Sequence, residues 1–336
     1  MRCGKQRFWR TLGCAMLAAA HAHVHVQAQA ASTSSGQEFP SRTLRFVVPF
    51  PPGGGTDILA RALAPQLNRA LGQSVVVDNR TGGNTVIGTE VVMRAPADGH
   101  TMLVIAPSFS INPFVRSKLP YDTAKDFSAL ARVAVSPLTI SVHPSVPAKD
   151  VKELIALARA KPGELTFATS SIIGGQRLAA ELFFRERAKA DIISVPYNGG
   201  APAATAVMGG HTTILISNLS EAAQQITAGR LRGIAVMSLA RTAQLPKLPT
   251  VAESGYPGFE AANWYGVVIR AATPRPIIDQ LGAEIGKALQ TGAVRDNLLR
   301  AGLDIAYLGP AAFDAYIRNE MQRNERIIKL LKLKLD

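Results

Sequence analysis

The residues best suited to hold a ligand are three consecutive glycines, Gly53 to Gly55, in the segment FPPGGGTD at 50–57. They stand between an apolar strand pattern and a segment with helical spacing. Glycine lets the backbone approach a ligand closely, and the first turn of a helix offers unpaired N–H groups and the positive end of the helix dipole. Together these features predict an anion site suited to a carboxylate or a phosphate. The alternative is a tight turn capped by Thr56, and a P-loop is excluded because no Gly-Lys-Ser/Thr follows.

A second loop of small and polar residues follows a later strand pattern. Residues 169–171 read Thr-Ser-Ser, and Gly174-Gly175 lead into a helix. The hydroxyl groups can donate to an anion or cap the helix. Ligands of open α/β sheets bind outside the carboxyl ends of the strands, so we expect the two loops to face each other across a cleft. Segments 196–200 and 217–218 also follow strands and are candidates to line it, although a turn or a helix cap is the alternative for each.

Known catalytic patterns are missing from the sequence. It contains no His-Glu-x-x-His, no Gly-x-Ser-x-Gly and no recognisable pair of carboxylates. His100, His143 and His211 are isolated from one another, which favours surface or structural roles. We therefore predict no catalytic residue, no metal ligand and no cofactor, although a triad assembled from distant residues stays open.

The first thirty residues resemble a secretory signal. A basic start is followed by the apolar stretch 12–20 and by the small-x-small sequence Ala28-Gln29-Ala30. We expect cleavage near Ala30 and a periplasmic protein; the alternative is an amphipathic helix that stays attached. Both cysteines, Cys3 and Cys14, fall inside this segment. The mature chain would then have no cysteine, which excludes a thiol nucleophile, an iron–sulfur cluster and a cysteine zinc site.

The amino-acid composition excludes several further classes of protein. Hydrophobic residues make up 47% of the chain and charged residues 18%, which excludes a disordered protein. The formal net charge of +13 favours anionic partners. A nucleic-acid partner is not expected, because the basic residues are scattered and only 6% of residues are aromatic. No segment after the signal has the ~20 uninterrupted apolar residues of a membrane span.

Short strand patterns alternate with helical patterns along the chain, which predicts α/β architecture with a parallel sheet and helices on both faces. Strands are expected at 43–49, 75–77, 102–106, 138–142, 165–169, 192–196, 213–217, 231–237 and 264–269, and helices at 56–71, 148–160, 175–187, 201–208, 219–228, 275–290, 292–301 and 310–331. The helices after the last strand suggest that the C-terminus packs back on the first domain. We therefore expect residues 31–133 plus 256–336 to form a discontinuous domain, and 134–255 an inserted one.

Beyond these patterns, the opening segment FVVPFPPGGGTDILARALAPQLNRALGQSVVVDNR resembles the Bug family of periplasmic receptors, the solute-binding components of tripartite tricarboxylate transporters. The resemblance continues in the same order through HPSVPAKDVKELIALARAKPGELTFA, VPYNGGAPAATAVMGG, LPTVAESGYPGFE and NWYGVV. It covers nearly all of residues 42–330.

The resemblance implies a two-lobed α/β protein with the type II periplasmic-binding-protein fold, each lobe a mostly parallel sheet flanked by helices. Such a receptor closes on a small carboxylate about hinges near 132–140 and 258–266. It then docks transiently on membrane transporter subunits, and we expect it to act as a monomer. Carried over with the loops above, the candidate ligand-binding residues are Phe50, Pro51, Gly54, Gly55, Thr56, Asp57, Ser108, Thr169, Ser170, Ser171, Gly174, Gly175, Tyr197, Asn198 and Asn218.

The second loop departs from the family pattern. A Gly-x-Gly-Ser/Thr stretch is common there, whereas this chain has Ser-Ile-Ile-Gly-Gly-Gln-Arg at 171–177. We therefore hypothesise that Ile172 and Ile173 form an apolar wall of the pocket, and that Arg177 is available to a second carboxylate. Two other functions stay open: a periplasmic α/β enzyme acting on a small carboxylate, and a ligand sensor with a signalling partner.

Overall fold

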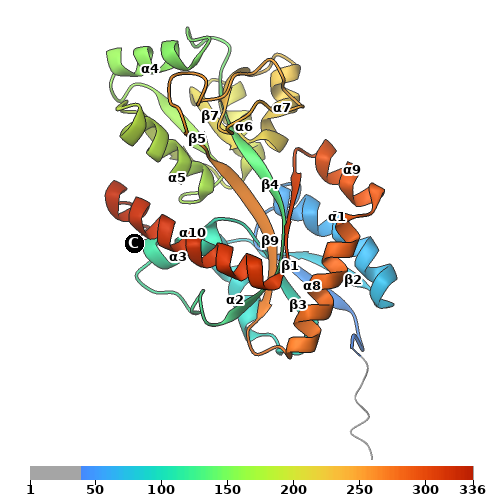
Figure 1. The fold of residues 1–336 in the computed structure, drawn as a ribbon. Coiled ribbons are helices and arrows are strands. Elements are labelled where there is room, and N and C mark those ends of the chain that lie inside the picture. The colour runs from blue at the N-terminus through green and yellow to red at the C-terminus, as the bar shows by residue number, and fades with distance from the viewer. Residues whose placement is uncertain (1–38, 336) are drawn as a thin grey trace, which may run out of the picture. The chain divides into compact units, whose positions relative to one another are not determined.

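Two long neighbouring strands, β4 (Phe127–Val142) and β9 (Ala262–Arg270), form the centre of a ten-stranded sheet in the computed structural model (Figure 1). The structure describes residues 39–335, and the expected signal segment 1–30 lies outside them. The other strands are β1 (Leu44–Val48), β2 (Val75–Asn79), β3 (Thr101–Ile105), β5 (Thr166–Thr169), β6 (Ile193–Pro196), β7 (Ile214–Asn218), β8 (Arg232–Val236) and β10 (Asp304–Leu308).

Ten α-helices flank this sheet in the described residues. They are α1 (Gly55–Leu71), α2 (Val86–Arg94), α3 (Ser108–Val115), α4 (Val151–Ala160), α5 (Gly175–Glu181), α6 (Gly200–Met208), α7 (Leu219–Thr227), α8 (Arg275–Leu289), α9 (Gly292–Arg300) and α10 (Pro310–Leu331). A 3-10 turn at Gly83–Thr85 precedes α2, and a π-helical segment, Leu182–Arg187, continues α5.

The strand order is β2-β1-β3-β9-β4-β7-β5-β6. Strands β1, β2 and β3 are parallel to one another, and so are β5, β6 and β7. Strands β4 and β9 run antiparallel to their neighbours; the first part of β4 pairs with β9 and β10, and its last part with β7 and β8. Each end of the sheet is therefore mostly parallel, and β4 runs through both.

The largest hydrophobic core lies where α1, α8 and α9 cover β1, β3 and β9. Leu59, Leu63 and Leu67 of α1 are fully buried in it and follow one another at four-residue intervals. That spacing places them on one face of the helix. The members of this cluster come from residues 44–134 and 265–303.

A second core lies at the other end of the sheet. Phe167 of β5 and Phe183 and Phe184 of the π-helical segment are fully buried in it, and every member comes from residues 138–259. The chain from Phe39 onward is nevertheless one compact unit. A division into the two expected domains therefore stays a proposal.

A third cluster, which we call the α10 cluster, joins elements far apart in the sequence. It comprises Ile111 and Val115 of α3, Ile173 and Leu178 around the start of α5, and Ile328, Leu331 and Leu333 at the end of α10. The C-terminal helix therefore contacts residues that precede and follow β4, and it does so beside the loop that begins α5.

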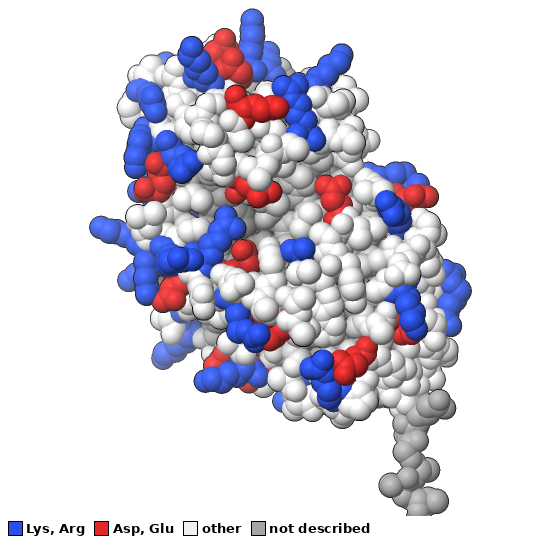
Figure 2. Space-filling view, in the orientation of Figure 1, with Lys and Arg blue, Asp and Glu red and all other residues white. Residues whose placement is uncertain are grey.

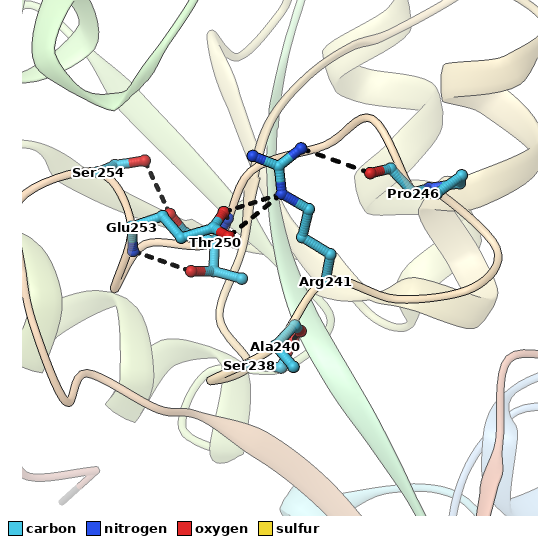
Figure 3. Close-up of polar contacts among 7 residues, drawn as sticks. All are labelled: Ser238, Ala240, Arg241, Pro246, Thr250, Glu253 and Ser254. Carbon is cyan, nitrogen blue, oxygen red and sulfur yellow. Dashed lines mark hydrogen bonds and ion pairs between the residues drawn. The ribbon is translucent and has the colours of Figure 1, made fainter.

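The connection after β8 has no helix or strand between 238 and 249, but side chains fix its path (Figure 3). Arg241 Nε donates to Glu253 Oε2 at 3.0 Å. The N–H of Thr250 donates to the same carboxylate, and Thr250 Oγ1 accepts from the N–H of Glu253, both at 2.9 Å. This reciprocal pattern is that of a capping box. The chain is thereby held in one path on its return to β9.

The expected elements are present with small shifts of their ends, and the structure adds others. The helices α2 and α3, the strand β10 and the first part of β4 were not predicted. Residues 127–135 are rich in alanine, which is uncommon in strands, and pairing with β9 and β10 on both sides holds them in a strand. Helix α3 contains Pro113, which breaks the usual helical pattern.

Candidate functional site

A cavity of about 510 Å³ lies between the β1–α1 loop and the N-terminal ends of α6 and α7, with β9 contributing Asn263 and Tyr265. Its volume is in the range of small-molecule sites. The lining residues are Phe50, Pro51, Pro52, Gly53, Gly54, Gly55, Thr56, Ala106, Ser170, Asn198, Gly199, Gly200, Ala201, Pro202, Ala204, Thr205, Met208, Asn218, Ser220, Glu221, Gln224, Gln225, Asn263 and Tyr265.

The first turn of α1 opens into this cavity. Gly54 occupies the N-cap position in an extended conformation and provides no side-chain cap. The N–H groups of Gly55 and Thr56 have no carbonyl one turn earlier in the helix to accept them. They remain for a ligand or water, at the positive end of a 17-residue helix.

Asp57 supports the glycine loop from behind. Its Oδ2 accepts from the N–H of Gly53 at 3.0 Å and from Arg61 Nε at 2.9 Å, and its Oδ1 accepts from Asn79 Nδ2 at 3.0 Å. Burial raises the pKa of Asp57, but the hydrogen bonds from Arg61, Gly53 and Asn79 outweigh it and lower the pKa below its ordinary value. Asp57 therefore fixes the loop and does not itself line the cavity.

Tyr265 of β9 lies against the start of α1. A Cβ built on Gly55 would stand 2.8 Å from both Oη and Cζ of the tyrosine, so glycine is required for this approach. The ring is 3% exposed, and its Oη is buried without a hydrogen-bond partner among the described residues. Burial and the negative charge of Glu221 raise the pKa of Tyr265, and the Asn263 side chain beside the hydroxyl lowers it by less. The hydroxyl therefore stays protonated and can donate beside the helix N-terminus.

Glu221 forms the opposite wall. It is the N3 residue of a capping box that begins α7: its Oε2 accepts from the N–H of Asn218 at 3.2 Å, and its Oε1 from Asn218 Nδ2 at 2.9 Å. Gln176 Nε2 donates to Oε2 at 3.3 Å. Burial raises the pKa of Glu221 and these donors lower it, with burial dominant. The side chain is partly buried and lines the cavity.

Four lining side chains carry a buried polar atom with no partner among the described residues. They are Ser220 Oγ, Gln225 Oε1, Asn263 Oδ1 and Tyr265 Oη. Buried polar groups in proteins are normally hydrogen-bonded to protein or water. The cavity therefore suits a polar ligand or ordered waters.

The second loop reaches the cavity only through Ser170. The N–H of Ser170 donates to Gln176 Oε1 at 2.8 Å, and its carbonyl accepts from the N–H of Gly199 at 2.9 Å. Thr169 Oγ1 donates to the carbonyl of Ser171 within the loop. A Cβ on Gly175 would lie 2.0 Å from Asn263 Oδ1, so this glycine admits a close contact with β9.

The apolar wall hypothesised for the second loop is not where we expected it. Ile173 is fully buried in the α10 cluster, and Ile172 is 49% exposed; neither lines the cavity. Arg177 donates to the carbonyl of Ile172 at 2.8 Å and pairs with Glu181, so its guanidinium is engaged outside the cavity. The direction of a loop side chain cannot be predicted from the sequence. Here, packing in the α10 cluster turns Ile173 away from the cavity.

The structure brings eight of the fifteen sequence-predicted residues to the cavity wall: Phe50, Pro51, Gly54, Gly55, Thr56, Ser170, Asn198 and Asn218. The other seven lie behind or beside it: Asp57, Ser108, Thr169, Ser171, Gly174, Gly175 and Tyr197.

Tyr265, Glu221 and Gln225 are the main lining residues that the sequence analysis missed. The pattern Asn-x-x-Glu at 218–221 is typical of a capping box and could have predicted the start of α7. Nothing in the local sequence shows that Tyr265 meets Gly55, because that contact depends on β9 lying beside β3.

Metal-ligating and charged side chains do not gather into a further candidate site in the described part of the chain. Within residues 39–335 no group of three or more histidine, cysteine or acidic side chains is placed to hold a metal ion. On the face shown in Figure 2, basic and acidic side chains are interspersed. None of the helices described between residues 39 and 335 is both long and apolar enough to cross a bilayer.

Two cores joined by crossing strands, with a ligand-sized cavity lined from both, define a periplasmic-binding-protein fold, and comparisons support this class. A structure from R. palustris, Rpa4515 with adipate, has 33% sequence identity, a TM-score of 0.84 and coverage of 88% of this chain and 99% of its own. MatC from Rhodopseudomonas palustris with bound malate has 27% identity, a TM-score of 0.79 and coverage of 86% and 100%.

The sequence comparisons identify the family. Protein BugT of Bordetella pertussis is 35% identical over 303 residues, which are 90% of this chain and 93% of BugT. The pattern of the tripartite tricarboxylate transporter family receptors matches residues 59–333. The chain therefore belongs to this family of solute-binding receptors, as the resemblance of its opening segment predicted.

Proposed function

We propose that this receptor captures a small organic carboxylate in the cavity and delivers it to the membrane subunits of a tripartite tricarboxylate-type transporter. One observation carries the proposal: the uncapped first turn of α1 and the unpartnered hydroxyl of Tyr265 meet at the wall of a cavity of about 510 Å³. N–H groups at a helix N-terminus, joined by a protonated phenol, are donors suited to a carboxylate. Relatives with bound adipate and malate support the same class of ligand.

Binding is accompanied by closure of two domains in this proposal, residues 31–133 plus 256–336 and residues 134–255. The cavity takes lining residues from both, and β4 and β9 connect them. Asn84 Nδ2 donates to the carbonyl of Ile173 at 2.8 Å, which links the first domain to the second loop. A ligand that contacts both domains binds the closed form more tightly and therefore shifts the population toward it.

The receptor does this without chemistry or cofactor, because backbone and phenol donors satisfy the carboxylate. We further propose export to the periplasm with cleavage near Ala30, and action as a monomer that docks transiently on its transporter. A periplasmic enzyme on the same scaffold is the rival function.

A carboxylate panel tests the proposal. Residues 31–336 are unfolded and refolded to remove any bound ligand, then melted with acetate, hexanoate, malate, citrate, adipate, benzoate and the matching amides. A true ligand at a hundred times its Kd adds about 2.7 kcal/mol to the free energy of unfolding. We expect stabilisation by one group of carboxylates, none by its amides, and weaker binding by Tyr265→Phe. Conversion of the ligand, followed by NMR, would favour the enzyme, and an unresponsive panel would reject the receptor site.

A further inference from the structure

The two walls of the cavity carry opposite electrostatic character. The first turn of α1 and Tyr265 present donors, as described above. On the other wall, Glu221 is the only acidic side chain among the described lining residues, and none of those residues is a lysine, arginine or histidine. A ligand with a carboxylate at each end would therefore place its second carboxylate against an acidic group, with no basic side chain to balance it.

Glu221 stands beside both helix N-termini on its wall. Glu221 caps α7 through the N–H of Asn218. It also lies against the start of α6: a Cβ on Gly200 would meet its carboxylate oxygens at 2.6 and 2.7 Å. A ligand anion therefore meets the Glu221 carboxyl group at the starts of α6 and α7, whereas no acidic side chain lines the cavity at the first turn of α1.

Glu221 also has room for one more donor. A carboxylate has about four lone-pair positions, and three N–H donors occupy Glu221: the backbone and side chain of Asn218, and Gln176. Gln225, one helical turn further along α7, lines the same wall and has its Oε1 buried without a partner among the described residues. Glu221 and Gln225 therefore offer acceptor positions on this wall that a donor group of a ligand can fill.

We propose that the cavity selects an organic acid with one carboxylate, held at α1, and an ammonium or other hydrogen-bond donor at its far end, held by Glu221 and Gln225. The inference rests on the proposed function and narrows it: dicarboxylates such as the adipate of the Rpa4515 structure are disfavoured here.

Matched ligands of equal length test the selection by calorimetry at pH 7. One set is adipate, 6-aminohexanoate and hexanoate; a shorter set is succinate, 4-aminobutanoate and butanoate. We expect the amino acid of at least one set to bind about tenfold or more tightly than the dicarboxylate of that set, because its ammonium can donate to Glu221 and Gln225 and a second carboxylate cannot. The unsubstituted acid is expected to lie between them.

Glu221→Gln removes the carboxyl group and keeps a residue that can serve in the capping box. We expect the preference for the amino acid over the dicarboxylate to fall by about tenfold or more. Glu153→Gln is the matched control, because Glu153 holds the same box position at the start of α4, where it accepts from the N–H of Lys149 far from the cavity.

The possible outcomes distinguish this inference from the proposed function. A dicarboxylate that binds more tightly than its amino acid in both sets overturns this inference and leaves the carboxylate receptor intact. An unchanged preference in Glu221→Gln, with the variant folded, also overturns it. Failure of every acid to bind rejects the proposed function and this inference with it. The comparison of the matched ligands on the wild-type protein tests the inference even if Glu221→Gln does not fold.

Discussion

Gly55→Ala is the sharpest perturbation of the anion site. The added Cβ would lie 2.8 Å from Cζ and Oη of Tyr265, about 0.6 Å inside ordinary contact. Tyr265 is 3% exposed and packs into the largest core, which limits how far the ring can move away from the added methyl group. Overpacking of this kind costs about 1–3 kcal/mol. For a chain of this size that lowers the melting temperature by about 2 to 5 °C.

The effect on binding is expected to exceed the effect on stability. The new methyl group separates the two donors of the anchor, the first turn of α1 and the Tyr265 hydroxyl. We expect affinity for the best carboxylate of the panel to fall about tenfold or more, measured by calorimetry well below the melting temperature. Gly54→Ala is the matched control, because its Cβ would meet only the carbonyl oxygen of Pro51, at 3.8 Å. Equal affinity and equal melting temperature for the two variants would refute the close contact.

Three further predictions concern the supports of the site. Asp57→Asn lowers the melting temperature at pH 6. Because the pKa of Asp57 is lowered in the folded protein, its stabilisation is fully present above the unfolded pKa of about 3.9, begins to decrease below it, and is lost as the pH falls through the lower folded pKa. A wild-type–variant gap in melting temperature that persists unchanged to pH 3 would contradict the ion pair. Asn84→Gly keeps the left-handed backbone (φ 53°) and loses the hydrogen bond from the Asn84 side chain to the carbonyl of Ile173. We expect ligand affinity to weaken by up to about tenfold. An unchanged affinity would show that Asn84 does not link the two domains. Ile173→Ala should cost about 2–5 kcal/mol in denaturant unfolding, and a loss below 1 kcal/mol would mean that the α10 cluster contributes little around Ile173.

The part of the site predicted from sequence is the part built from local patterns. Three glycines between a strand and a helix identify a loop, a helix start and an open anion position without any long-range information. Gly54, Gly55 and Thr56 accordingly line the cavity. Asp57 was included because it is adjacent in sequence, but its partners Arg61 and Asn79 turn it away from the cavity.

The parts that were missed depend on contacts between distant segments. Tyr265 and Gly55 are brought together by the pairing of β3 with β9. The register of that pairing cannot be predicted from the sequence of either strand alone. Ile173 illustrates the same limit for a loop: we expected it in the apolar wall of the pocket, but it packs in the α10 cluster instead. The fold class was easier because alternating strand and helix patterns span the whole chain.

The pairing of β4 with β9 restricts how the two ends of the sheet can move. Phe127 to Pro137 pair with Arg270 to Ala262, so the connection is a hydrogen-bonded two-stranded ribbon rather than two independent tethers. Sliding one strand along the other by a residue would break the whole ladder and turn every side chain to the opposite face. Twisting costs far less, since strands twist naturally. In the proposed closure, this pairing therefore favours rotation of the two ends over sliding, so that the strands keep the same register in the open and closed forms.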